Sequence, residues 1–84
     1  MPTSNEDGAR DGTYRVYDAR SIGHAIRHFR REAGLTQEEL AEKTGLSRYY
    51  IIEMEQGLET EHLRRLLRVL KSLGVRVALE KHDW

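Results

Sequence analysis

The sequence contains 84 residues, no cysteine, and equal numbers of basic and acidic side chains, so its formal net charge is zero. A chain of this length forms one domain, and such a small domain lacks the large cavity that most enzymes need. The lack of cysteine excludes disulfides and thiolate metal sites, and no apolar run approaches the ~20 residues of a membrane span. We therefore expect a soluble, cytoplasmic, non-enzymatic domain with no cofactor, supported by helix packing or dimerisation.

The N-terminal residues 1–12 are polar and charged, which predicts a disordered tail and no signal peptide. Residues 13–17 are β-prone and are interpreted as an arm or an edge strand. We place the folded domain at residues 13–80 and a C-terminal tail at residues 81–84.

The first predicted helix begins after Asp18, a good N-cap residue, and runs to about Ala33. Its apolar stripe is expected to consist of Ile22, Ile26, Phe29 and Ala33. His24 and His28 are four residues apart on this helix, a spacing that can hold a metal. Without a third ligand nearby they are interpreted as a solvent-facing pair, and no metal site is predicted.

The second and third predicted helices span residues 37–43 and 48–55. Thr36 and Ser47 are their expected caps, and Glu39 completes a capping box with Thr36. Leu46, between the two helices, is expected to face inward. Because only a few residues separate these helices, they should cross steeply, as in a helix-turn-helix.

A fourth helix is expected over residues 61–73, capped by Thr60, and a strand is expected over residues 75–80. The helix carries more apolar residues than one core-facing stripe requires, which indicates that a partner covers a second face. A lone strand must pair with residues 14–17 or with the same strand of a second subunit. We expect the second arrangement, with a dimer interface that contains Leu66, Val69, Leu73, Val75, Val77 and Leu79. The fold class is therefore mainly α, with four to five helices and one C-terminal strand paired across a dimer.

Charge is distributed unevenly along the chain. Residues 19–31 and 62–73 carry several basic side chains, whereas an acidic run lies between them. Such segregation is compatible with a basic binding face on a neutral protein, or with ordinary solvated helix faces.

The segments RREAGLTQEELA (30–41), TGLS (44–47) and EQG (55–57), together with Ile26, Arg27 and Ile51, closely resemble the lambda-repressor-like, or XRE-type, helix-turn-helix family. The resemblance covers about residues 20–74. It implies a DNA-binding domain whose third helix enters the major groove of an operator. The strand after the last helix and the terminal Trp84 look most like the HipB-like antitoxins, which repress their own operon as dimers and bind a HipA-like kinase toxin.

The resemblance also implies roles for individual residues. Base contacts would fall on Arg48, Tyr49 and Glu53, because arginine reads guanine and a carboxylate accepts from cytosine. Phosphate contacts would fall on Gln37, Lys43, Tyr50, Gln56 and Arg27. Thr36 and Ser47 would be structural caps, and Arg30 and Glu55 would form a buried ion pair between the first and third helices. Trp84 would be a candidate anchor for a toxin.

Three departures from the family pattern bear on this interpretation, and one of them is the negative charge that Glu53 adds to the third helix. Glu59 and Glu61 stand in a loop that usually carries basic or small polar residues, and carboxylates there would repel phosphates. Ile52 stands where the family prefers a small polar residue. The alternatives to an antitoxin are therefore a stand-alone or phage-type repressor and a protein-interaction adaptor that does not bind DNA.

Overall fold

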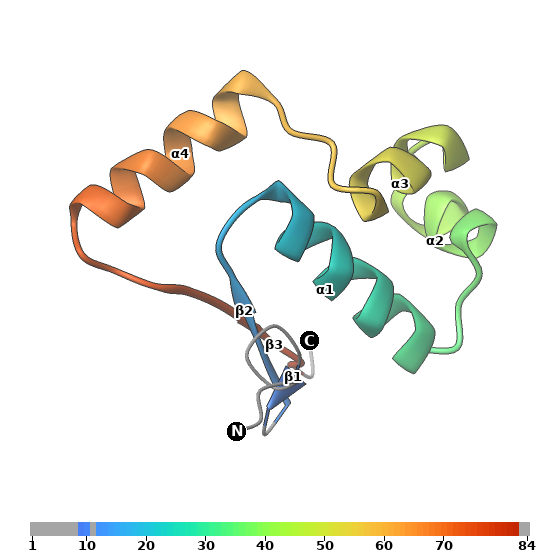
Figure 1. The fold of residues 1–84 in the computed structure, drawn as a ribbon. Helices are drawn as coiled ribbons and strands as arrows, with labels where there is room; N and C mark the ends of the chain where they lie inside the picture. Colours follow the sequence, from blue (N-terminus) through green and yellow to red (C-terminus); the bar gives the residue numbers. More distant parts are fainter. Residues whose placement is uncertain (1–8, 11, 83–84) are drawn as a thin grey trace.

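The computed structural model describes residues 9–10 and 12–82 of the chain. Within these residues there are four helices and one three-stranded antiparallel sheet (Figure 1). The elements are β1 (Ala9–Arg10), β2 (Thr13–Val16), α1 (Ala19–Glu32), α2 (Gln37–Thr44), α3 (Arg48–Glu55), α4 (Glu61–Ser72) and β3 (Val77–Glu80). The predicted mainly α architecture with a C-terminal strand is confirmed. None of the described helices is long and apolar enough to span a bilayer.

Each helix begins directly after a residue whose side chain caps it. Ser21 donates its backbone N–H to Asp18 Oδ1 over 2.9 Å, and Glu39 donates its own to Thr36 Oγ1 over 3.0 Å. Ser47 and Thr60 accept in the same way at the starts of α3 and α4. These bonds satisfy backbone donors that have no partner within a helix, which explains why the predicted starts agree with the structure.

The core is formed where α1 packs against α3 and β2 through small side chains. Val16, Ala19, Ala25, Ala41 and Ile51 are the buried apolar residues of the described chain. At Gly23 the backbones approach so closely that an added Cβ would lie 2.4 Å from the carbonyl oxygen of Met54. This contact explains why the smallest side chains of α1, and not its largest, occupy the most buried positions.

The expectation that Leu46 faces inward was wrong, and the predicted apolar stripe of α1 is less buried than the small residues beside it. Ala33 is exposed because it lies at the C-terminal cap of α1, beyond the contact with α3. Leu46 is 43% exposed because it follows Gly45, whose positive φ of 75° turns the chain outward between α2 and α3. Ile22, Ile26 and Phe29 are only half-buried, since the closest approach of α1 to α3 runs through Gly23.

The sheet resolves the two strand pairings that the sequence left open. β2 is the central strand, and β3 pairs antiparallel with it in the same chain, with Val16 opposite Val77 and Tyr14 opposite Leu79. This is the first of the two expected pairings; because β3 is an outer strand of the sheet, its pairing across a dimer stays a prediction. Residues 9–10, assigned to the tail, form β1 and extend the domain toward the N-terminus. The rest of that tail lies outside the described residues.

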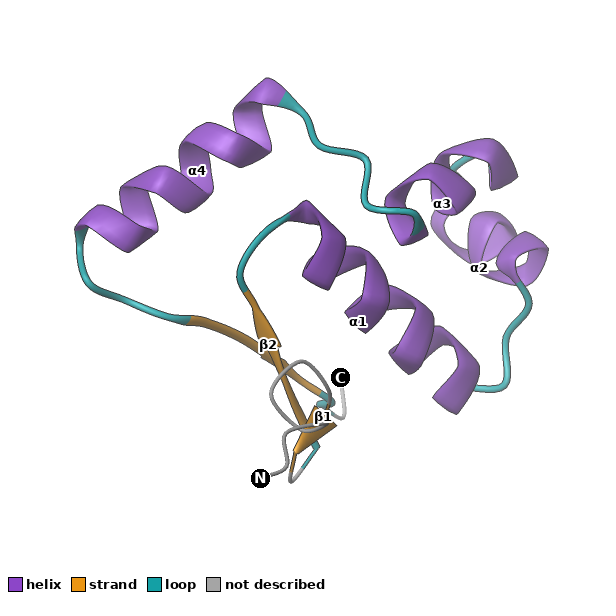
Figure 2. Cartoon of the chain, viewed as in Figure 1, coloured by secondary structure: helices purple, strands orange, loops and turns teal. Residues whose placement is uncertain are grey.

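Helix α4 lies apart from the other three helices (Figure 2). None of its 12 described residues is buried. Leu63, Leu67 and Leu70 are half-buried, whereas Leu66 and Leu73 are 46% and 67% exposed. The helix thus has one apolar row directed at its own chain and a second row directed at solvent.

Candidate nucleic-acid interface

Helices α2 and α3 form the predicted helix-turn-helix. The turn between them consists of residues 45–47, where Gly45 adopts a left-handed conformation and Ser47 caps α3. Ile51 anchors α3 in the core, at 1% exposure. Because the buried residue lies on one side of α3, the opposite side is available to contact another molecule.

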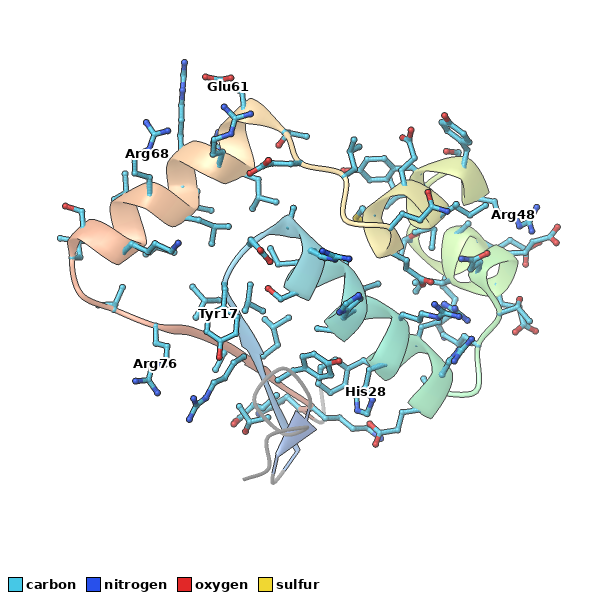
Figure 3. All side chains as sticks on the ribbon, in the orientation of Figure 1. Tyr17, His28, Arg48, Glu61, Arg68 and Arg76 are labelled. Atoms are coloured by element: carbon cyan, nitrogen blue, oxygen red, sulfur yellow. The ribbon has the colours of Figure 1, made fainter. Side chains whose placement is uncertain are left out.

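The exposed side of α3 carries the residues expected to read bases. Tyr49 is 69% exposed and Arg48 is also exposed. Figure 3 shows Arg48 at the edge of the molecule, at the opposite end from Arg68 of α4. Glu53 is half-buried, and its hydrogen bond with the Tyr49 hydroxyl raises the pKa of that tyrosine. The structure thus brings the three candidate base-contact residues together on one helix, with two of them linked.

A buried ion pair joins α1 to the end of α3. Arg30 Nε lies 2.5 Å from Glu55 Oε2, and Arg30 Nη2 lies 3.0 Å from Glu55 Oε1. The two side chains are only 9% and 4% exposed. Arg30 Nη1 also donates to the carbonyl oxygen of Leu35 over 2.8 Å, so the guanidinium also holds the connection between α1 and α2.

The electrostatics of this pair follow from its surroundings. Burial alone would raise the pKa of the Glu55 carboxyl, but hydrogen bonds from Arg30 and Gln37, with the charges of Arg30 and Arg27, lower it overall. The hydrogen bond with Glu55 in turn raises the pKa of Arg30. Both groups are therefore charged in the folded protein, and each compensates for the desolvation of the other.

Gln37 has a role that the sequence did not reveal. Its Nε2 donates to Glu55 Oε1 over 3.1 Å, so the side chain expected to contact a phosphate is already bound to the ion pair. Residues 37 and 55 are far apart in the chain, and no local pattern signals the contact. A phosphate contact at Gln37 would therefore use the backbone N–H groups at the start of α2, where a helix N-terminus favours an anion, rather than the side chain.

Some of the candidate phosphate contacts line one polar depression of about 350 Å³ between α1, α2 and α3. Its lining consists of Arg27, Arg30, Arg31, Gln37, Ile52, Glu55 and Gln56. Lys43 and Tyr50 are exposed elsewhere, on α2 and α3. The structure therefore gathers Arg27, Gln37 and Gln56, adds Arg31, and leaves the other two candidates outside the depression.

The acidic loop before α4 is less repulsive than its sequence suggests. Glu59 lies 3.6 Å from Arg64, and Glu61 lies 2.9 Å from Arg65. Arg64 also approaches Glu61 at 3.6 Å. The charges expected to weaken phosphate binding thus have arginines beside them, in exposed and therefore weak ion pairs.

The residues expected at a dimer interface fall into two groups. Leu66, Val69, Leu73 and Val75 are exposed by 46% to 67%. Val77 and Leu79 instead face their own chain: Val77 lines a depression with Val16 and α4, and Leu79 lines another with α1. Their assignment to a dimer interface stays a prediction, since the structure describes one chain and β3 is an outer strand of the sheet. Trp84 lies outside the described residues.

Comparison with known proteins matches the same part of the chain. A family model described as a helix-turn-helix domain covers residues 21–82. An uncharacterized HTH-type transcriptional regulator of Methanothermobacter thermautotrophicus is 47% identical over 49 residues, which cover 58% of this chain and 71% of that protein. The regulator SinR of Bacillus subtilis is 36% identical over 67 residues, or 74% of this chain and 60% of SinR. The immunity repressor protein of Bacillus phage phi105 is 38% identical over 58 residues, which cover 69% of this chain and 40% of the repressor.

Proposed function

This chain belongs to the helix-turn-helix family of DNA-binding transcriptional regulators, and we propose that it represses transcription as a homodimer bound to an inverted-repeat operator. The observation that carries the proposal is the exposed N-terminal half of α3, held on a scaffold that the Arg30–Glu55 pair locks. Repression is steric: the bound dimer excludes polymerase from the promoter. The similarity to the immunity repressor protein of Bacillus phage phi105 supports this direction of control.

In the proposed complex, α3 enters the major groove. Arg48 is at the first position of the helix, where its guanidinium can donate two hydrogen bonds to guanine O6 and N7. Tyr49 and Glu53 act as a linked pair, because the hydroxyl of one is hydrogen-bonded to the carboxylate of the other. The Tyr49 hydroxyl occupies one acceptor site of the Glu53 carboxylate, so the amino group of a cytosine would have to bind another site of the same carboxylate.

Phosphate contacts surround this helix. The start of α2, at Gln37, offers backbone N–H groups and the positive end of a helix dipole. Arg27 and Gln56 lie in the same depression, and the exposed Lys43 and Tyr50 extend the contact along α2 and α3. These contacts set the register and the affinity, whereas the base contacts set the sequence preference.

The exposed row of α4 supports dimerisation. Full burial of an apolar side chain stabilises a complex by about 1.5–3 kcal/mol. Leu66, Val69 and Leu73 are 46%, 54% and 67% exposed, so a partner could bury them further. A two-fold dimer would present two α3 helices to half-sites about 34 Å apart. This geometry explains why α4 carries more apolar surface than its own chain covers.

The test is a fluorescence anisotropy titration with the duplex upstream of the chain's own start codon, next to a scrambled duplex, at two salt concentrations. We expect selective binding that weakens steeply with salt. Arg48→Ala should weaken it roughly tenfold to a hundredfold, the cost of one bidentate base contact. Arg15→Ala, which removes an exposed charge on β2, is the matched control and should leave affinity unchanged. Equal affinity of the Arg48→Ala protein and the wild type would contradict the site assignment.

An antitoxin role is a second candidate, supported by the strand that follows α4. In that case a HipA-like kinase binds surfaces away from α3, and Trp84 anchors it. Co-expression with a kinase-like protein from a neighbouring gene, followed by co-purification, tests this role. Trp84→Ala should reduce the recovery of the kinase, whereas Arg48→Ala should not.

A further inference from the structure

We infer that the outer face of α1 is a second DNA-backbone site, which binds phosphates beyond the base pairs contacted by α3. This α1 basic face consists of His24, Arg27, His28 and Arg31. The inference rests on the proposed function, because it concerns the same DNA. It adds a contact surface outside the helix-turn-helix and a length requirement for the duplex.

The four side chains share one side of the helix because they follow the spacing i, i+3, i+4 and i+7. They line an open depression of about 660 Å³ together with Tyr14 and Glu32. The polar depression between α1, α2 and α3 shares Arg27 and Arg31 with it. The α1 basic face is therefore continuous with the surface that holds Gln37 and Gln56, and a duplex seated on α3 passes beside it.

The arginines of this face are not held in short ion pairs, although the charge of Arg27 contributes to lowering the pKa of Glu55. In the described part of the chain, neither Arg27 nor Arg31 takes part in an ion pair. Arg64 and Arg65 of α4 are in contrast bound to carboxylates. Arg68 of α4 is also outside the ion pairs of the described residues, but Arg27 and Arg31 lie next to each other on one face, where Glu32 offsets part of the charge.

Aromatic contacts hold one edge of the face in place. The His28 ring lies 5.3 Å from the Tyr14 ring and 5.0 Å from the Phe29 ring, measured between centroids. His28 is half-buried as a result, whereas the sequence predicted that it faces solvent together with His24. A side chain that is already ordered loses less entropy on binding, so its ring N–H is a suitable donor for a phosphate oxygen.

The dimensions of the face also suit DNA. Seven residues of helix separate the first and last members, or about 10 Å at 1.5 Å per residue. One strand of B-DNA places a phosphate about every 3.4 Å along the axis. The face can therefore contact two or three successive phosphates of one strand.

The experiment compares two fluorescein-labelled duplexes. The first is the region upstream of the start codon trimmed to the footprint of the protein, and the second extends it by about one helical turn of scrambled sequence at each end. We expect wild type to bind the longer duplex more tightly and with a steeper dependence on salt. The double variant Arg27→Ala/Arg31→Ala should lose this gain, and its slope of log affinity against log salt should be less negative by about 0.9 for each lost contact.

Two further variants keep the result interpretable. Arg27→Lys/Arg31→Lys retains the charges and should retain most of the gain, which separates loss of phosphate contact from loss of structure. Arg15→Ala removes a charge from β2 and should behave as wild type. If the alanine double variant keeps both the gain and the slope while wild type still prefers its own sequence, the inference is overturned and the proposed function stands. If wild type does not distinguish its own footprint from a scrambled one, the proposed function fails, and the inference with it.

Discussion

The α1–α3 unit and helix α4 both combine charged and apolar side chains, but they are stabilised differently. In the first, a buried ion pair, a buried Ile51 and the close contact at Gly23 hold three helices together. In the second, all the ion pairs are exposed and none of the described helix is buried. The difference teaches that the DNA-reading unit is complete within one chain, whereas α4 leaves apolar surface for a partner.

The largest effect is expected from breaking the buried pair. Glu55→Ala leaves the Arg30 guanidinium buried without its carboxylate, which should lower the free energy of unfolding by about 3–5 kcal/mol. Urea denaturation measures this loss. Glu61→Ala removes a carboxylate from an exposed pair with Arg65 and is the matched control, with an expected loss below about 1 kcal/mol. Equal losses in both proteins would erase the distinction between the two regions.

The close contact between α1 and α3 should be nearly as sensitive. Gly23→Ala places a methyl group against the carbonyl oxygens of Met54 and Glu55, so the helices must separate, at a cost of about 1–3 kcal/mol. The neighbouring His24→Ala changes an exposed residue on the same helix and should change stability by less than about 0.5 kcal/mol. A Gly23→Ala protein with an unchanged melting temperature would show that this packing is looser than described.

The exposed row of α4 can be tested through the oligomeric state. Leu66→Lys/Val69→Lys should abolish the dimer, because two charges per subunit would enter an apolar interface, while α1–α3 should stay folded. Sedimentation velocity measures the first effect, and the ellipticity of the helices follows the second. Arg68→Ala, on the same helix, should leave the dimer intact. A wild-type protein that remains monomeric at every concentration tested would remove the role assigned to this row.

The smallest expected effect is the pH dependence of the free energy of unfolding, which tests whether the charge of Glu55 stabilises the fold. The pKa of Glu55 is lowered in the folded protein from its ordinary value of 4.5. Its contribution to stability is therefore complete above pH 4.5 and is lost as pH falls through the lowered folded value. Urea unfolding of wild type and Glu55→Gln across this range should show a difference that shrinks toward acid. A difference that stays constant with pH would mean that ionisation of Glu55 does not contribute.

The helix boundaries follow from the sequence because their determinants are local. A capping side chain reaches a backbone N–H three residues away, as Thr36 reaches Glu39, so four residues suffice to predict a start. The position of Arg48 and Tyr49 at the exposed start of α3 follows in the same way from Ser47. The resemblance to known helix-turn-helix domains implied the pairing of Arg30 with Glu55, which periodicity alone does not reveal.

Other features required the tertiary structure, because they join residues whose separation in the chain carries no pattern. Periodicity shows which residues share a face of α1, but it does not show that Gly23 marks the closest approach to α3. The alternating strand at the C-terminus had two possible partners, and the tertiary structure shows that it pairs with β2 of the same chain, with Val77 and Leu79 lining depressions of that chain. The sequence by itself therefore determined the helices, their caps and the exposed positions of Arg48 and Tyr49, because each of these depends on residues only a few positions apart. Only the packed chain decided which strands pair, which arginines remain unpaired, and that Gln37 binds Glu55, since these depend on distances that folding alone creates.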